Sequence, residues 1–198
     1  MPKSATSGAA KVLSSESIFQ GRNFELKREQ VIEPGGIEAT RNVIAHSGSV
    51  VVLPVFPDGR ILMIRQYRHA AGQFLWELVA GHREQNETFR ETAPRELQEE
   101  TGYRAQKFTR LFEIYPAPGL LGEKMELYLA EGLTKGNSQQ EPDEKISQRI
   151  FTLPELEGWI RSGKIKDAKT VAGILYYSKF LAAQKPQNKP SPSKRRNR

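Results

Sequence analysis

GHREQNETFRETAPRELQEETGY, residues 81–103, is the stretch of sequence that most strongly indicates the fold. Thr88 and Glu91 have the spacing of a capping box, in which each side chain bonds the backbone of the other at a helix N-terminus. Gly102 stands where a helix commonly ends in a left-handed residue. The stretch predicts a helix from Thr88 to about residue 101, with a buried stripe that recurs every four residues: Ala93, Leu97 and Thr101.

Pro94 lies inside this predicted helix. A proline removes one backbone donor, and its ring collides with the carbonyl four residues earlier, here that of Arg90. We therefore expect either a kink or a helix that starts later than Thr88.

Three glutamates share one side of the same helix. Glu96, Glu99 and Glu100 stand at i, i+3 and i+4 and so fall within an arc of about 100°. Like charges at this spacing destabilise a bare helix by roughly a few tenths of a kcal/mol per pair. A bound hard cation removes that cost, and carboxylate oxygens are ligands that Mg²⁺ prefers. The cluster is therefore either a solvated acidic face or a magnesium site, and zinc is not expected in it because no His or Cys joins it.

The full spacing of the stretch resembles the Nudix box, G-x5-E-x7-R-E-U-x-E-E-x-G-U, where U is a bulky apolar residue. The matching residues are Gly81, Glu87, Arg95, Glu96, Leu97, Glu99, Glu100 and Gly102, with Tyr103 at the last bulky position. The resemblance implies an α/β fold, the Nudix-type α/β/α sandwich with a mixed sheet. It also implies hydrolysis of the diphosphate in a nucleoside diphosphate linked to another group.

The resemblance further implies a site built around a divalent cation. Glu96 and Glu100 would be direct ligands, and Glu99 would bind directly or through water. The backbone carbonyl of Ala80 would be a further ligand, and Arg95 would orient and neutralise the glutamates. The implied cofactor is Mg²⁺, with Mn²⁺ as a substitute.

Outside the box, residues 15–183 are similar to the ADP-ribose pyrophosphatase branch of that family. The pieces that carry this similarity are RQYR at 65–68, WELVAG at 76–81, the loop 116–123 and DAKT at 167–170. A proline about fifteen residues beyond the box marks the branch, and Pro118 stands there.

This similarity places substrate contacts at Arg65, Arg68 and Glu77 and in the loop with Pro118 and Glu123. An arginine suits a phosphate, and a glutamate suits amino or hydroxyl donors of a base or sugar. Relatives often read P-G-F-S-D-E where residues 118–123 read PGLLGE, so Glu123 is the acid that the loop retains.

The branch also suggests a water-activating base in a loop before the last strand. Here that loop contains Glu141, Asp143 and Glu144, and alignment favours Glu144 with the other two as fallbacks. Glu99 is the alternative base.

Hydrophobic patterning supplies the remaining elements. The continuous apolar run 49–56 indicates a central strand covered on both faces, and 74–80 indicates another strand. We expect a disordered N-terminus at 1–14, an N-terminal antiparallel β segment at 15–46, the Nudix domain at 47–184 and a disordered basic tail at 185–198. Relatives use such a β segment to form a homodimer, and a small isolated sheet is poorly stable, so we expect a homodimer here.

The net charge of +7 is concentrated in one segment, because residues 185–198 carry +6 and leave +1 for the remainder. We therefore expect no specific nucleic-acid partner. No apolar stretch approaches the roughly 20 residues that span a bilayer, and the chain has no cysteine for disulfides or thiolate metal sites. The expected location is the cytoplasm, without a membrane partner.

Three functions remain open from the sequence. The first is hydrolysis of ADP-ribose or a related ADP-sugar to AMP and a sugar phosphate. The second is hydrolysis of GDP-mannose or another nucleotide sugar. The third is a non-catalytic module that binds nucleotides. The sequence fixes neither the base and sugar, nor the number of metal ions, nor the phosphorus attacked.

Overall fold

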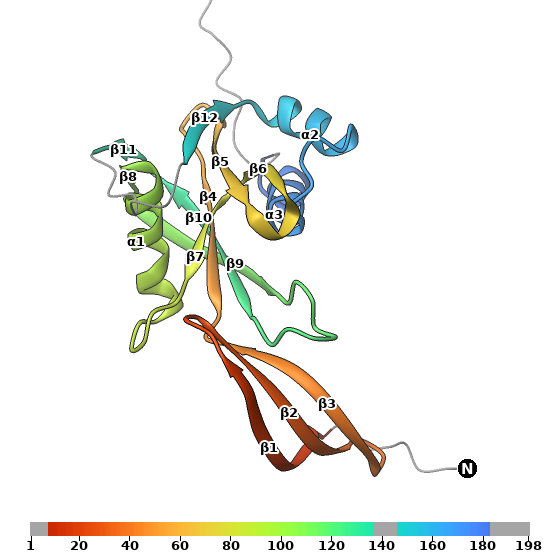
Figure 1. The fold of residues 1–198 in the computed structure, drawn as a ribbon. Helices are drawn as coiled ribbons and strands as arrows, with labels where there is room; N and C mark the ends of the chain where they lie inside the picture. The colour runs from red at the N-terminus through yellow and green to blue at the C-terminus, as the bar shows by residue number, and fades with distance from the viewer. Residues whose placement is uncertain (1–7, 137–145, 183–198) are drawn as a thin grey trace, which may run out of the picture.

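The computed structural model describes residues 8–136 and 146–182. An N-terminal sheet, residues 11–46, projects as an arm from a body in which helices lie on both sides of β-structure (Figure 1). The expected basic tail at 185–198 lies outside the described residues.

The body is built on a four-stranded sheet of order β7-β4-β10-β9. Its strands are β4 (Ser49–Pro54), β7 (Val79–His82), β9 (Lys107–Ile114) and β10 (Met125–Glu131). β4 and β10 are parallel and the other neighbours are antiparallel, so the sheet is mixed. Every residue of β4 is buried, as a continuous apolar run requires.

A three-stranded sheet of order β12-β5-β6 packs beside it. Its strands are β5 (Ile61–Arg68), β6 (Gln73–Glu77) and β12 (Ser147–Phe151). The remaining elements are the short helix η1 (His69–Ala71) and the paired strands β8 (Tyr103–Arg104) and β11 (Thr134–Lys135). The single strand expected at 74–80 is wrong, because β6 and β7 belong to different sheets. The break falls at Leu78, whose buried N–H donates to Thr170 Oγ1 at 2.8 Å rather than to a neighbouring strand.

Helices cover both faces of the central sheet. They are α1 (Phe89–Thr101), α2 (Leu153–Arg161) and α3 (Ala168–Phe180). Ala93 and Leu97 of α1 pack in one apolar cluster, and Leu156 of α2 and Ile174 of α3 pack in a second one. The expected α/β/α sandwich with a mixed sheet is therefore confirmed. Among the described residues, no helix is both long and apolar enough to cross a membrane.

α1 starts and ends where the sequence predicts. Both bonds of the capping box between Thr88 and Glu91 are present, and Gly102 closes the helix at φ 73°. Pro94 lies inside the helix, which runs from Phe89, so the expected alternative of a helix that starts later than Thr88 is wrong. The capping box satisfies backbone donors at the first turn and fixes the start there, although Pro94 removes one donor further along.

The arm consists of β1 (Lys11–Gln20), β2 (Phe24–Glu33) and β3 (Ile37–His46). β1 begins before the boundary expected at residue 15, because residues 11–14 already pair with β2. The arm joins the body at Ile44, whose N–H donates to the Leu120 carbonyl and whose carbonyl accepts from Gly122 N–H, both at 2.9 Å.

Candidate active site

An open cleft of about 1290 Å³ lies where the arm meets the body. Residues 20 and 22–25 of the arm line one side, and β7, the following loop and α1 line the other. Of the residues expected in a site, the cleft brings together Arg68, Ala80, Arg95, Glu96, Glu99, Glu100 and Glu123.

The three clustered glutamates form one wall of this cleft. Glu96 and Glu100 are buried, with 9% and 3% of their surface exposed, whereas Glu99 is half-buried. Glu100 Oε2 accepts a hydrogen bond from the Ala80 N–H at 3.3 Å, which ties the helix to β7. A solvated acidic face would leave these side chains outside, so their burial in a cleft favours a role in binding cations.

Arg95 uses all five of its N–H donors, four on glutamates and one on a backbone carbonyl. Its Nη1 donates to Glu96 at 2.8 Å and to Glu99 at 2.9 Å. Its Nη2 donates to the His82 carbonyl, and Nε and Nη2 form a bidentate pair with Glu87, each at 2.9 Å. One guanidinium thus fixes the loop after β7 and the carboxylates of α1 in a single geometry.

Glu87 matches the motif, but the sequence alone assigned it no role. The hydrogen bond from Arg95 is the main reason that the pKa of Glu87 falls from 4.5 to about 2, and a bond from the Thr92 hydroxyl adds to it. The same carboxylate raises the pKa of Arg95. Glu87 therefore stays ionised and holds Arg95 in place.

A second charged group stands behind the cleft around Glu77. This carboxylate is 1% exposed and accepts two bonds from Arg68, both at 2.8 Å, and one from Lys169 Nζ at 2.5 Å. Burial raises the pKa of Glu77, but the bonds from Arg68 and the charge of Lys169 outweigh it, and the pKa lies below its ordinary value. Arg68 and Lys169 line the cleft, whereas Glu77 does not.

Lys169 was not singled out from the sequence. It lies in the first turn of α3 beside the N-cap Asp167, to which its Nζ is 2.9 Å away. The residues around Lys169 do not indicate a role for it, because its partner Glu77 lies 92 residues earlier in the chain.

The other expected substrate residues are spread more widely. Arg65 is exposed and stacks over the Phe74 ring at 4.6 Å, and Pro118 is exposed in its loop; neither lines the cleft. Glu123 is buried in the cleft and accepts a bond from the Ser49 hydroxyl. Glu141, Asp143 and Glu144 lie outside the described residues.

Two histidines in the cleft were also missed. His46 and His82 come from β3 and β7, and their ring centroids are 4.9 Å apart. Desolvation, followed by the charge of His46, lowers the pKa of His82. Their separation of 36 positions hides this pairing from motif analysis.

Comparisons with known proteins agree with this geometry. The NUDIX domain family matches residues 45–173. The chain is 36% identical over 179 residues to "ADP-ribose pyrophosphatase" of Bacillus subtilis (strain 168), covering 88% of this chain and 97% of that protein. It is 34% identical over 168 residues to "Methanol dehydrogenase activator" of Bacillus methanolicus, covering 84% and 91%.

A solved structure described as "Crystal structure of ADP compounds hydrolase" shares the fold, with a TM-score of 0.76 and 21% identity over 89% of this chain and 96% of that one. The match to the family therefore spans the sheet, α1 and the buried glutamates of the cleft, and the chain belongs to the NUDIX family of hydrolases.

Proposed function

We propose that this protein hydrolyses ADP-ribose, or a related ADP-sugar, to AMP and a sugar phosphate with the help of Mg²⁺. The observation that carries the proposal is the convergence of Glu96, Glu99 and Glu100 in one cleft, where Arg95 holds the first two and the Ala80 N–H bonds the third. The name of the Bacillus subtilis relative supports the choice of ADP-ribose.

The donor set fits a hard divalent cation. Three carboxylates, those of Glu87, Glu96 and Glu99, pair with one guanidinium, and Glu100 lines the same cleft, so the cluster keeps a net negative charge. Glu96, Glu99, Glu100 and the Ala80 carbonyl would hold Mg²⁺, for which Mn²⁺ would substitute. When bound, the cation neutralises diphosphate charge and lowers the pKa of a water.

The protein's own residues would orient the reaction. Water adds to one phosphorus, the bridging P–O bond breaks, and a proton leaves to a base. We assign that base to Glu144, with Glu99 as the alternative. Glu99 is a candidate because it is half-buried at the cleft, where it is hydrogen-bonded to Arg95. Arg95 would keep the carboxylates apart from one another and aimed into the cleft.

The charged group around Glu77 would bind a phosphate of the substrate's diphosphate. Arg68 and Lys169 present cations to the cleft and suit a phosphate oxygen. Glu77, buried behind them, would hold both cations in place, and Glu123 would lie near the bound ligand. Arg65 and Pro118 do not line the cleft of a single chain, so they would contact the substrate only in the dimer.

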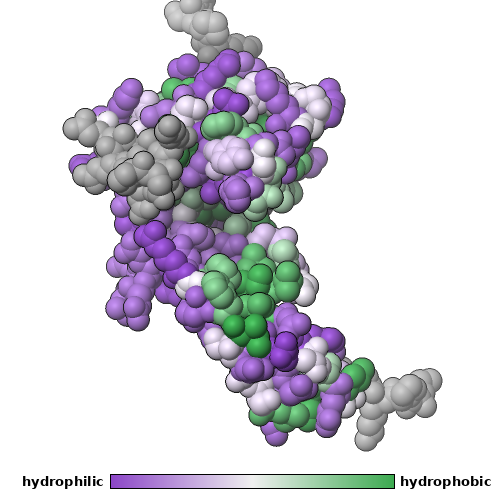
Figure 2. Space-filling view, in the orientation of Figure 1, coloured by the Kyte–Doolittle hydropathy of each residue, from purple (hydrophilic) through white to green (hydrophobic). Residues whose placement is uncertain are grey.

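The arm would supply a homodimer interface. Within the arm, only Val31 is a buried hydrophobic residue. Large apolar side chains of the arm are exposed instead, at Val12, Leu13, Ile18, Phe19, Phe24 and Ile37. Figure 2 shows hydrophobic surface gathered where the arm meets the body and again toward the free end of the arm. A second copy that covers this surface would also close the cleft, whose rim includes residues 20 and 22–25.

A panel of nucleotide sugars with Mg²⁺ or Mn²⁺ tests the proposal. ADP-ribose should give the highest kcat/KM, and preference for GDP-mannose would select the second substrate class. Glu100→Gln should lose at least about a hundredfold in rate, whereas Glu38→Gln, at an exposed position in the arm, should lose nothing. Hydrolysis in H₂¹⁸O then locates the phosphorus attacked. If no substrate is hydrolysed, the remaining function is that of a non-catalytic module that binds nucleotides.

A further inference from the structure

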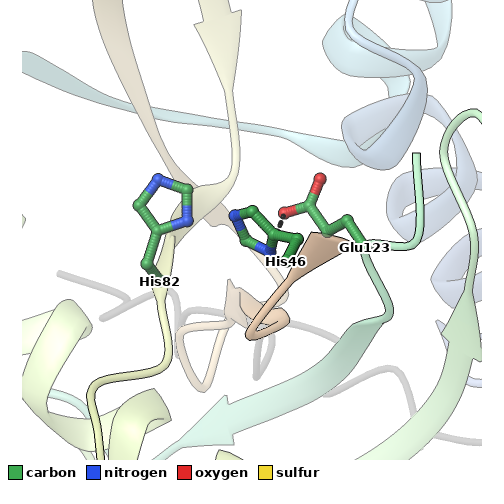
Figure 3. A group of neighbouring side chains, drawn as sticks. All are labelled: His46, His82 and Glu123. Atoms are coloured by element: carbon green, nitrogen blue, oxygen red, sulfur yellow. Dashed lines mark ion pairs between the residues drawn. The ribbon is translucent and has the colours of Figure 1, made fainter. Parts of the chain in front are cut away.

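Three metal-ligating side chains meet beside the carboxylate wall. His46 comes from the end of β3, His82 from the end of β7, and Glu123 from the loop that precedes β10. One donor atom from each lies within 4.8 Å of the other two. Figure 3 shows the His46 ring between the other two side chains, with the Glu123 carboxylate on one side and the His82 ring on the other.

Surrounding bonds fix two of the three donors. His46 Nδ1 accepts from the Gly48 N–H at 2.9 Å and lies 3.9 Å from Glu123 Oε1. Glu123 is oriented by the Ser49 hydroxyl, and the side chains of His46 and Glu123 are only 7% and 10% exposed. This bond occupies the Nδ1 lone pair of His46, so a metal bound through Nδ1 would replace the Gly48 N–H as its partner.

The third donor faces open solvent. His82 is exposed and lines the cleft, so a cation and its remaining ligands would have access from outside. Its backbone carbonyl is already held by Arg95, which limits how far β7 can shift.

The group is separate from the glutamates of α1. A Cβ built on Gly81 would point at the Glu96 carboxylate, so this side of β7 faces α1. Side chains alternate along a strand, and His82 therefore projects to the opposite side of β7 from Glu96. The two clusters share the cleft but use different faces of the same strand.

We propose that His46, His82 and Glu123 form a second cation site, which takes a divalent transition metal of the zinc class rather than Mg²⁺. Two imidazoles and one carboxylate are a donor set that suits zinc with one position left for water or a phosphate oxygen. Donor atoms around tetrahedral zinc lie about 3.4 Å apart, given bonds of about 2.0–2.1 Å. The group must therefore contract by no more than about 1.4 Å, mainly through the exposed His82. The proposal does not depend on the identity of the substrate.

The third histidine of the chain supplies the control. His69 lies in η1, is exposed, and does not line the cleft. Full-length, tag-free protein saturated with Mg²⁺ is titrated with Zn²⁺ while the ¹⁵N imidazole resonances are followed by NMR. The resonances of His46 and His82 should shift together at one equivalent, and those of His69 should not. Unchanged His46 and His82 resonances, or a shift at His69 alone, would overturn the site.

Calorimetry with the carboxylate wall neutralised gives an independent readout. Zn²⁺ should bind the Glu96→Gln/Glu100→Gln protein with one equivalent. Adding His82→Ala should weaken it by more than about tenfold, the lower end of the effect that even an outer-shell partner has, whereas adding His69→Ala should change nothing. Absence of Zn²⁺ binding in the double variant, or equal affinities for the two histidine variants, would refute the proposal. Neither measurement needs hydrolysis, so the test of this cation site is independent of the proposed function.

Discussion

The carboxylate of Glu96 occupies the space that a side chain on Gly81 would need. A Cβ at residue 81 would lie 1.9 Å from Glu96 Cδ and 2.0–2.1 Å from its oxygens, far inside contact distance. Gly81 does not have a positive φ, so its backbone conformation is open to other residues. The glycine of the motif is therefore required by the close approach of the helix carboxylate to β7.

Gly81→Ala should displace the Glu96 carboxylate by an ångström or more while β7 still forms. A misplacement of about 1 Å in a catalytic group can cost about a hundredfold in rate, and Mg²⁺ affinity should fall with it. Steady-state kinetics and Mg²⁺ titration check this. Gly158→Ala is the matched control, because a Cβ there meets nothing within 4 Å. Unchanged kinetics in Gly81→Ala would contradict the placement of Glu96.

Glu87→Gln should destabilise the fold in a way that depends on pH. Because the pKa of Glu87 is lowered from 4.5 to about 2 in the folded protein, its stabilisation is complete above 4.5 and is lost as the pH falls toward 2. We expect a deficit of about 1–3 kcal/mol at pH 7, the scale of a hydrogen bond to a charged group. Thermal unfolding from pH 7 to pH 2.5 should show this deficit shrinking below pH 4.5. A deficit independent of pH would exclude Glu87 as its source.

Local signals were sufficient to predict α1 and the clustering of its three glutamates. The capping box, the left-handed Gly102 and the i, i+3, i+4 glutamates all depend on neighbours within one or two helical turns. The strand at 74–80 was predicted wrongly because its break depends on Thr170, which lies 92 residues from Leu78. Periodicity cannot register a hydrogen bond made across the domain.

Contacts between distant segments also hid two residues of the candidate site. Lys169 and His82 gain their surroundings from Glu77 and His46, in other elements. Glu77 was expected to contact substrate, but its burial behind two cations could be seen only once β6 and α3 were placed together.

Glu144→Gln and Glu99→Gln should separate the two candidate bases. Loss of a general base lowers kcat by about 10²–10⁴ and leaves metal affinity intact. Loss of a ligand weakens Mg²⁺ binding as well. We expect the first pattern for Glu144→Gln and the second for Glu99→Gln, measured as kcat at saturating Mg²⁺ and as the Mg²⁺ concentration for half-maximal rate. The reverse pattern would assign the base to Glu99.

Phe19→Asp should dissociate the proposed homodimer. Phe19 is 57% exposed on the arm and its ring lies 5.9 Å from that of Phe24, which lines the cleft. A single copy leaves this apolar pair in water, and burying a large apolar side chain contributes about 1.5–3 kcal/mol, so a partner that covers the pair gains from both rings.

A carboxylate at residue 19 would have to be buried without a partner, which is costly. Light scattering after gel filtration should give a dimer for the wild type and a monomer for Phe19→Asp. The KM should rise because residues 20 and 22–25 form one rim of the cleft. Glu38→Gln, on an exposed position of β3, should remain dimeric. A monomeric wild type would remove the arm from the interface and require the single chain to complete its own cleft.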